Sequence, residues 1–193
     1  STKITTATDE NLIVDVIVRA FRSDPVVRWA WPDLHSYLTN FPSFVRVFGG
    51  KAFSQGSAYF VDDYAGAALW LLPNTSPDEE MLYEILQRTV LDDRKADLFT
   101  MFEEMDSYHP SEPHWYLPLI GIDPSKQGKG YGSALMQPIL SQCDQSQIPA
   151  YLEATSVKNL SFYQRHGFEL LGTIQVGTSP SLSPMLREPQ SYT

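Results

Sequence analysis

An apolar strand, a glycine-rich turn and the start of a helix follow one another directly between residues 120 and 132. The segment reads Ile-Gly-Ile-Asp-Pro-Ser-Lys-Gln-Gly-Lys-Gly-Tyr-Gly, with glycines at positions 128, 130 and 132. Because glycine has no Cβ atom, the main chain of such a turn can wrap an anion and adopt the unusual φ values this needs. The first N–H groups of the following helix have no helical partner and lie at the positive end of the helix dipole. The segment therefore predicts a site for a pyrophosphate group.

The composition is that of an ordinary globular protein. The chain has 193 residues, of which 42% are hydrophobic, so it can bury one core, and we expect a single domain over residues 1–193. No apolar run approaches the roughly 20 residues needed to cross a bilayer, and residues 1–20 lack a basic start followed by an apolar stretch. We therefore expect a cytoplasmic protein.

The net charge of −9 limits the classes of ligand. Nucleic acids and anionic membranes need clustered lysines and arginines, so neither is expected as a partner. A cationic small molecule is favoured instead. The histidines and acids lack the spacing of metal ligands, and we expect no metal site. Cys143 lies late in a predicted helix, away from the glycine turn, and no covalent enzyme intermediate is expected there.

The expected secondary structure divides the chain into two halves. Residues 57–61 and 65–72 read as antiparallel strands joined by a tight turn, and the second half alternates strand, helix, strand, helix and strand. The remaining strands are expected at residues 3–7, 115–122, 150–154, 168–176 and 183–187. Helices are expected from a cap at Thr8 to about residue 23, and at residues 34–53, 78–91, 94–108, 130–145 and 159–166. This order predicts an α/β fold with a mixed sheet flanked by helices.

Two other kinds of phosphate-binding loop fit the glycine turn less well. A P-loop needs Gly, four residues and then Gly-Lys-Ser/Thr, and neither Gly121 nor Gly128 begins that spacing. A dinucleotide-binding turn, G-x-G-x-x-G, matches Gly128 and Gly130, and Glu153 falls near the end of the next strand. However, its third glycine is one residue early, and five residues separate the strand from the first glycine. A nicotinamide-dependent oxidoreductase remains an alternative, and it would bind NAD.

The run from Gln127 to Gly132 resembles the Gln/Arg-x-x-Gly-x-Gly/Ala pattern of the GNAT superfamily of acetyl-CoA-dependent N-acetyltransferases. The block Asn-Leu-Ser-Phe-Tyr-Gln-Arg-His-Gly-Phe at residues 159–168 also sits where that family carries its second motif. Residues 114–117 and 149–155 are similar to those of the puromycin N-acetyltransferase group. The resemblance is continuous from about Trp115 to Arg187 and faint before it. It implies a GNAT-type fold, with a largely antiparallel central sheet of about seven strands flanked by helices.

The resemblance implies a binding site for acetyl-CoA as the acyl donor. In the family, the strand here spanning residues 117–122 carries a bulge and splays from the next strand, which leaves main-chain N–H groups free for the pantetheine and thioester. Asn159 either bonds the pantetheine or caps the short helix that follows it. The residues expected along the coenzyme are Leu119, Ile120, Ile122, Gln127, Gly128, Lys129, Gly130, Tyr131, Gly132, Ser133, Asn159 and Tyr163.

Acetyl transfer to an amine needs a base for the amine and an acid for the departing thiolate. The resemblance makes Tyr163 the general acid, because the family's tyrosine at this position points at the sulfur; its alternative role is packing under the coenzyme. Glu153 is the first candidate for the base, directly or through water, and its alternatives are pairing with a lysine or binding a cationic substrate. His114 has the more suitable ordinary pKa, but we expect it at the surface because it lies at the outer end of its strand.

The acceptor is expected opposite the coenzyme, against the first half of the chain. Aromatic faces and carboxylates suit an ammonium group, and Asp24 and Asp33 offer negative charge there. Core packing explains the same aromatic residues without a ligand. The residues expected to line this site are Trp29, Trp31, Tyr37 and Phe41.

The reaction implied is direct transfer from acetyl-CoA to the primary amine of a small molecule within a ternary complex. A protein or peptide N-acetyltransferase and a non-catalytic CoA-binding module are the alternatives. A homodimer is expected from the family's habit alone.

Overall fold

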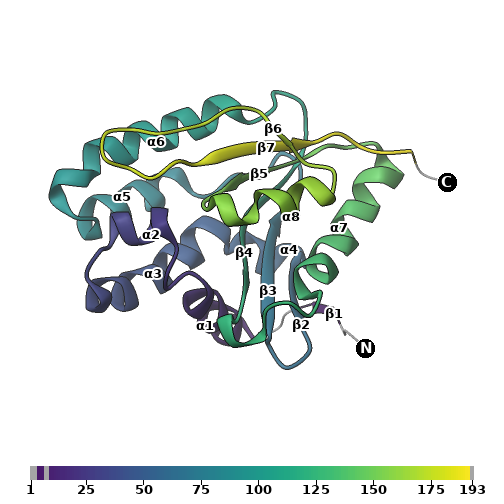
Figure 1. The fold of residues 1–193 in the computed structure, drawn as a ribbon, viewed down its shortest axis with the longest axis horizontal. Coiled ribbons are helices and arrows are strands. Elements are labelled where there is room, and N and C mark those ends of the chain that lie inside the picture. Colours follow the sequence, from purple (N-terminus) through teal and green to yellow (C-terminus); the bar gives the residue numbers. More distant parts are fainter. Residues whose placement is uncertain (1–3, 7–8, 192–193) are drawn as a thin grey trace.

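The computed structural model describes residues 4–6 and 9–191 and contains a seven-stranded sheet (Figure 1). The strand order is β1-β2-β3-β4-β5-β7-β6, and only β4 and β5 pair in parallel. The strands are β1 (Ile4–Thr6), β2 (Ala58–Val61), β3 (Gly66–Leu71), β4 (Trp115–Ile122), β5 (Ala150–Ala154), β6 (Glu169–Leu170) and β7 (Ser183–Arg187). The prediction of a mixed, largely antiparallel sheet is confirmed.

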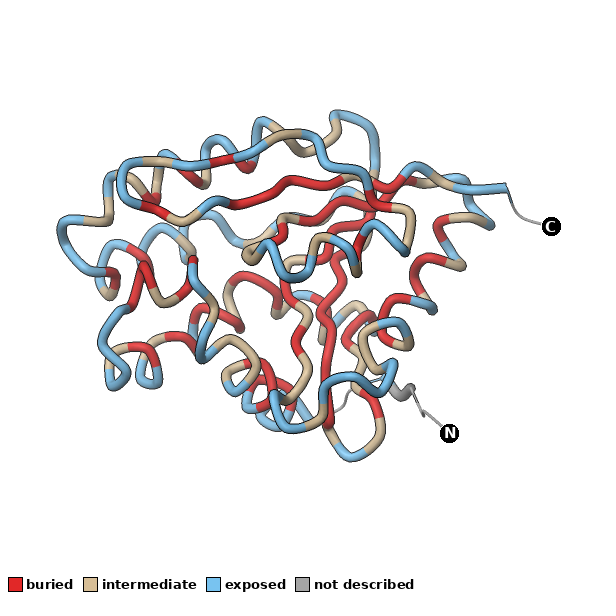
Figure 2. Tube along the Cα trace, in the orientation of Figure 1, coloured by how far each residue is buried: buried red, intermediate tan, exposed pale blue. Residues whose placement is uncertain are grey.

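Helices cover both faces of this sheet. Because side chains alternate along a strand, Leu69 and Leu119 face a core with α1, α3, α5 and α6, while Ala68 and Trp70 face a second core under α7 and α8. Figure 2 shows the strands between them as mostly buried. The helices are α1 (Glu10–Ala20), α2 (Pro25–Ala30), α3 (Leu34–Gly49), α4 (Lys51–Gln55), α5 (Glu79–Thr89), α6 (Lys95–Tyr108), α7 (Tyr131–Ser146) and α8 (Leu160–Arg165), with 3₁₀ turns η1 (Asp92–Arg94), η2 (Pro124–Lys126) and η3 (Val157–Asn159).

The short helix α2 has no counterpart among the expected helices. Asp24 caps it, because its side chain accepts the N–H groups of Val26 (3.0 Å) and Val27 (2.9 Å). Pro25 occupies the first helical position, where its missing N–H costs nothing and its fixed φ suits the helix. At the start of α1 the cap is Asp9, and the expected cap Thr8 lies outside the described residues, as do Lys3 and Ala7 of the expected strand 3–7.

The strand expected over residues 168–176 is much shorter in the structure. Only Glu169 and Leu170 pair with β7 as β6, and Ile174 forms a single bridge with Leu182. Between them, Tyr108 packs against Gly172, and the chain leaves the ladder at this point. The prediction of a nine-residue strand was therefore wrong.

β4 carries a bulge and then separates from β5. Leu69 pairs with Leu119 and Leu71 with Tyr116, so two residues of β4, Leu117 and Pro118, stand opposite one residue of β3. On the other side, the pairing with β5 covers only residues 115–116 and 150–151. Figure 1 shows β5 and β7 turned across the direction of β3 and β4. The bulge and the splay implied by the family resemblance are both present.

A nearly buried ion pair joins α7 to β7. The Arg187 guanidinium, whose side chain is 5% exposed, binds both carboxylate oxygens of Asp144 at 2.8 and 3.1 Å. Its Nε donates to the His166 carbonyl (2.8 Å), at the end of α8. Breaking a buried pair from one side leaves an uncompensated charge, and we expect Asp144→Asn to lower the free energy of unfolding by about 3 kcal/mol.

This loss depends on pH in a defined direction. The hydrogen bond from Arg187 holds the pKa of Asp144 below its ordinary 3.8. The stabilisation is therefore full above pH 3.8 and disappears as the pH falls through the lower folded-state pKa. Urea unfolding of the unmodified protein and of Asp144→Asn, at pH 7 and at pH values below 3.8, measures the difference in the free energy of unfolding. Glu84→Gln, in the exposed pair with Arg88, is the control and is expected to change stability by less than about 0.5 kcal/mol. Equal losses in the two variants would contradict the assignment.

Candidate functional site

The start of α7 has the geometry of an anion site. Gly128 and Gly130 both have φ of +79°, in the left-handed region that favours glycine, and Gly130 is the N-cap without a side-chain cap. Because the Ala134 N–H donates to Gly130, the N–H groups of residues 131–133 have no helical acceptor. A Cβ atom added at Gly128 or Gly130 would meet no atom within 4 Å, so the space beside the turn is open. The turn therefore fits a diphosphate group.

The other residues expected around the turn hold it in place or lie exposed beside it. A hydrogen bond from the Tyr131 hydroxyl to Asp62 in the β2–β3 turn raises the pKa of Tyr131. Gly132 packs against the Phe162 ring of α8. The remaining three are exposed to solvent: Gln127, Lys129 and Ser133.

Beyond residue 116, main-chain groups of β4 point into the gap that opens between β4 and β5. Residue pairs of an antiparallel ladder alternate between exchanging hydrogen bonds and pointing outward. Since the Asp123 N–H donates to Ala65 (2.8 Å), residues 119 and 121 fall on bonding positions toward β3. Ile120 and Ile122 then turn their N–H and C=O groups to the side from which β5 has diverged. Leu119 instead contributes a buried side chain to the core.

Tyr163 of α8 presents a hydroxyl group with no partner. Its side chain is buried, and the hydroxyl makes no hydrogen bond with any described residue. Burial, and secondarily the charge of Asp24, raises the pKa of Tyr163, so the phenol stays protonated at neutral pH. Asn159, before α8, is exposed, and its side chain does not cap that helix.

Glu153 of β5 is a carboxylate with one bonded and one free oxygen. Its side chain is only 4% exposed. Oε1 accepts the Tyr116 hydroxyl at 2.5 Å, whereas Oε2 has no hydrogen-bond partner in the part of the chain that the structure describes. Nε2 of His109 lies 3.5 Å from Oε2. Burial and the charge of Glu153 raise the pKa of Tyr116 well above its ordinary value, so Tyr116 remains a donor.

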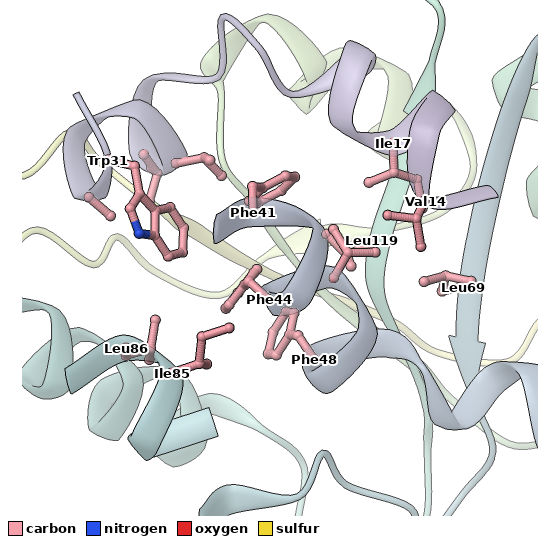
Figure 3. Close-up of a cluster of buried hydrophobic side chains, with 14 of the residues drawn as sticks. Val14, Ile17, Trp31, Phe41, Phe44, Phe48, Leu69, Ile85, Leu86 and Leu119 are labelled. Atoms are coloured by element: carbon pink, nitrogen blue, oxygen red, sulfur yellow. The ribbon is translucent and has the colours of Figure 1, made fainter. Parts of the chain in front are cut away.

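An apolar cavity lies between this carboxylate and the helices of the first half. Pro118 and Leu119 of the splayed strand line it, together with Trp31 and Phe48, and Glu153 is its one charged lining residue. Figure 3 shows Phe41, Phe44 and Phe48 of α3 between Trp31 and Leu86 on one side and Leu119 on the other. We call this the apolar cavity.

Three of the four residues expected to line an acceptor site pack together: the ring centroid of Phe41 lies 6.0 Å from that of Trp31 and 5.0 Å from that of Tyr37. Trp31 lines the apolar cavity, while Trp29 donates its indole N–H to the Thr178 hydroxyl (3.1 Å). Tyr37 and Phe41 are completely buried, and neither lines the two cavities described here. The Tyr37 hydroxyl donates to the carbonyl of Val18 at 2.6 Å, and this hydrogen bond joins α3 to α1. Both side chains lie in the core, as the alternative of core packing predicts, and a contact of Tyr37 or Phe41 with the acceptor stays a prediction.

The two expected aspartates cap helices. Asp33 is exposed and accepts the Ser36 N–H (2.9 Å) at the start of α3. Asp24 accepts a hydrogen bond from Thr155, which lines the apolar cavity. Burial raises the pKa of Asp24. Only Asp24 therefore lies close to the cavity.

A second, larger cavity of about 750 Å³ borders α5, α6 and residues 109–114. We call it the acidic cavity, because no lysine or arginine among residues 4–6 and 9–191 lines it, whereas four acids do: Glu79, Glu103, Asp106 and Glu112. His109, His114 and Tyr116 also line it. No pattern in the sequence indicates the contact of His109 with Glu153, which is 44 positions away. His114, expected at the surface, is partly buried against His109.

Three further observations bear on the chemistry. Cys143 is buried, and burial raises the pKa of its thiol to about 12, so it is not a nucleophile at neutral pH. Within residues 4–6 and 9–191, no group of three or more metal-ligating side chains occurs. No helix in the same residues combines the length and the hydropathy that a bilayer crossing requires.

Comparison with known sequences points to acetyltransferases. The profile of the acetyltransferase (GNAT) domain matches residues 95–170, from α6 to β6. An uncharacterised N-acetyltransferase of Schizosaccharomyces pombe is 30% identical over 162 residues, which are 71% of this chain and 62% of that protein. The chain thus spans less than two thirds of the length of this relative.

Solved structures share the fold over nearly the whole chain. One, from Corynebacterium glutamicum, is described as "histone acetyltransferase HPA2 and related acetyltransferase"; it is 27% identical, with a TM-score of 0.69 and coverage of 100% of this chain and 99% of that one. Arylalkylamine N-acetyltransferase 2 from Aedes aegypti has a TM-score of 0.66 at 13% identity, covering 98% and 100% of the two chains. The second likeness concerns the fold alone.

Proposed function

Because the chain carries a GNAT acetyltransferase domain, we propose that it transfers the acetyl group of acetyl-CoA to the primary amine of a small molecule. One observation carries this proposal: the gap between β4 and β5 has the anion site of α7 near one end and the apolar cavity with Glu153 at the other. Acetyl-CoA supplies an activated thioester that an amine attacks directly. Because Cys143 is buried and its thiol stays protonated, it supports direct transfer without a covalent acetyl-enzyme intermediate.

The donor is held chiefly by main-chain groups. The free N–H groups of residues 131–133 bind the diphosphate, with Lys126 and Lys129 adding positive charge beside it. The outward-facing groups of Ile120 and Ile122 hold the pantetheine arm. Main-chain donors fixed near the thioester also stabilise the developing oxyanion, an effect of about 3 to 4 kcal/mol where it has been measured in other enzymes.

Glu153 is the base in this proposal. A nearly buried carboxylate oxygen without a partner is costly to keep in a folded protein, which supports a functional role for Oε2. It lines the same cavity as Pro118 and Leu119, at the splay where the thioester would lie. The ammonium group of the acceptor is attracted to this carboxylate and loses a proton to it.

The preferred acceptor is an amine with an apolar or aromatic body. Apart from Glu153, the cavity is lined by apolar and neutral side chains, including Trp31 and Phe48. The net charge of −9 favours a cationic ligand over an anionic one. The mosquito relative's name, an arylalkylamine N-acetyltransferase, supports this class.

A lysine of a basic protein or peptide is the second acceptor class. The acidic cavity favours it, because its four acids and absence of lysine and arginine suit a positively charged chain. The description of the Corynebacterium relative as a histone acetyltransferase or related enzyme points the same way. This class is tested together with the first.

The test is a thiol-release assay with acetyl-CoA, followed by mass spectrometry of the product. The panel contains arylalkylamines, polyamines, aminonucleosides, amino acids and a lysine-rich peptide, and the expected result is the highest kcat/KM for an arylalkylamine. The matching tertiary amine, which cannot form a stable amide, is the control and is expected to release no thiol. Coenzyme binding without thiol release from any amine would contradict the proposal and favour a non-catalytic CoA-binding module.

Tyr163→Phe tests the general acid. We expect kcat to fall by about a hundredfold, because the thiolate then leaves without a proton donor, and the dissociation constant of acetyl-CoA to change little. Steady-state kinetics and calorimetry measure the two quantities. Tyr64→Phe, in the β2–β3 turn, removes a hydroxyl elsewhere and should keep full activity. An unchanged kcat in Tyr163→Phe would remove the acid role.

A further inference from the structure

Behind Glu153, two histidines connect its free oxygen to the protein surface. His109 lies in the connector after α6, and its Nε2 faces Oε2 of Glu153 at 3.5 Å. Its Nδ1 is 2.9 Å from Nε2 of His114, the residue before β4. Nδ1 of His114 is in turn 2.9 Å from the main-chain carbonyl of Glu112. The two histidines are therefore hydrogen-bonded to each other, with the Glu112 carbonyl as a fixed acceptor at one end and Oε2 of Glu153 at 3.5 Å from the other end.

That fixed acceptor determines the tautomers. A carbonyl oxygen only accepts, so Nδ1 of His114 carries a proton. Burial is the main cause that lowers the pKa of His114, which keeps it neutral near pH 7 and leaves a lone pair on its Nε2. His109 must then donate its own Nδ1–H to His114. A neutral His109 consequently presents an unprotonated Nε2 to the carboxylate of Glu153.

This nitrogen lies 3.5 Å from Oε2, the oxygen that takes the amine proton in the proposed function. Resting on the proposed function, we propose that His109 takes up the proton that Glu153 removes from the amine and releases it to solvent in the acidic cavity. His114 acts as a positioning residue that fixes the tautomer of His109.

The proton balance of this relay closes over one turnover. The amine N–H bond breaks and an Oε2–H bond forms on Glu153. The Oε2–H bond then breaks as the proton moves to the lone pair on Nε2 of His109, and the Nε2–H bond breaks in turn as the proton passes to water in the acidic cavity. The carboxylate is then free for the next amine, and the only net product is one proton in solvent.

The acidic cavity is the route by which the proton leaves His109 for solvent. The His109 side chain is 23% exposed and lines it. The titratable groups that line this side of the cavity or contact His109 are acids, phenols and His114, and no lysine or arginine of the described residues lines the cavity. These groups are Asp106 of α6, Glu79 of α5, Glu112 and His114 of the connector, Tyr116 of β4, and Tyr151 and Glu153 of β5.

Chemical rescue tests the relay. His109→Ala is expected to lower kcat about tenfold or more without a comparable change in KM for the amine, and added imidazole should restore kcat in proportion to its concentration, because the acidic cavity admits it. Substituted imidazoles should rescue according to their pKa. His35→Ala, at an exposed position of α3, is the control and should show full activity with no imidazole response. A loss in His109→Ala that imidazole does not restore would overturn the proposal.

A second measurement does not depend on turnover. Nitrogen-15 spectra of the full chain at pH 7 should show His114 as the neutral Nδ1–H tautomer and a hydrogen bond from Nδ1 of His109 to His114. Glu153→Gln should shift the Nε2 signal of His109, because the amide of glutamine can donate a hydrogen bond to that nitrogen. His114→Ala should give a mixture of His109 tautomers. Unchanged His109 signals in Glu153→Gln would overturn the relay alone, whereas the expected signals without thiol release from any amine would contradict the proposed function.

Discussion

Glu153→Gln is expected to lower kcat/KM for the amine by about 10²- to 10⁴-fold and to leave the affinity for acetyl-CoA nearly unchanged. The amide keeps the shape of the side chain and can still accept the Tyr116 hydroxyl, but it cannot take a proton from the substrate. The loss should shrink for acceptors of low pKa, because such amines arrive already deprotonated. Steady-state kinetics with a series of amines measures this dependence.

The matched control for this substitution is Glu169→Gln, at an exposed position of β6. It removes one negative charge from the chain without touching either cavity. Its kcat/KM should equal that of the unmodified protein. If Glu153→Gln loses the same factor with every amine, whatever the amine's pKa, Glu153 binds the ammonium group rather than deprotonating it.

Gly130→Val is expected to weaken acetyl-CoA binding about a hundredfold. Valine is strained at a φ of +79°, and its side chain would occupy the open space beside the turn. Losing two charge-assisted hydrogen bonds at about 1.5 kcal/mol each gives about 3 kcal/mol, which corresponds to roughly that factor in the dissociation constant. Isothermal titration calorimetry with acetyl-CoA measures it.

Gly56 provides the control, because it has the same left-handed backbone conformation as Gly130 but does not lie at the anion site. Its φ is +71°, and an added Cβ atom would also meet nothing within 4 Å, but it ends α4 rather than starting α7. Gly56→Val should therefore show similar backbone strain in unfolding experiments and normal affinity for acetyl-CoA. Equal weakening in both variants would mean that lost stability, rather than a filled anion site, explains the effect.

The second half of the chain was predictable because its signals are local. The glycine spacing marks the start of α7, and the strands expected at residues 115–122, 150–154 and 183–187 have those bounds in the structure. A turn, a cap or an apolar run depends on neighbours in sequence, so spacing alone locates it. The motif at residues 159–168 likewise places α8 and Tyr163 together with the turn.

The surroundings of Glu153 could not be predicted in this way. Its contacts with His109 and Tyr116 depend on how the connector after α6 folds across the sheet, and no periodicity records that path. Tyr37 and Phe41 show why the sequence left two roles open. Aromatic residues suit a ligand pocket and a core equally, and only the packing of α3 against α1 places these two in the core.

The most direct test of the account is a calorimetric titration of the unmodified protein with coenzyme A and with pantetheine, which lacks the diphosphate. If the free N–H groups at the start of α7 hold that diphosphate, coenzyme A should bind at least about a hundredfold more tightly than pantetheine, and the difference should disappear in Gly130→Val. Equal affinities for the two ligands in the unmodified protein, or no binding of coenzyme A, would contradict the central claim.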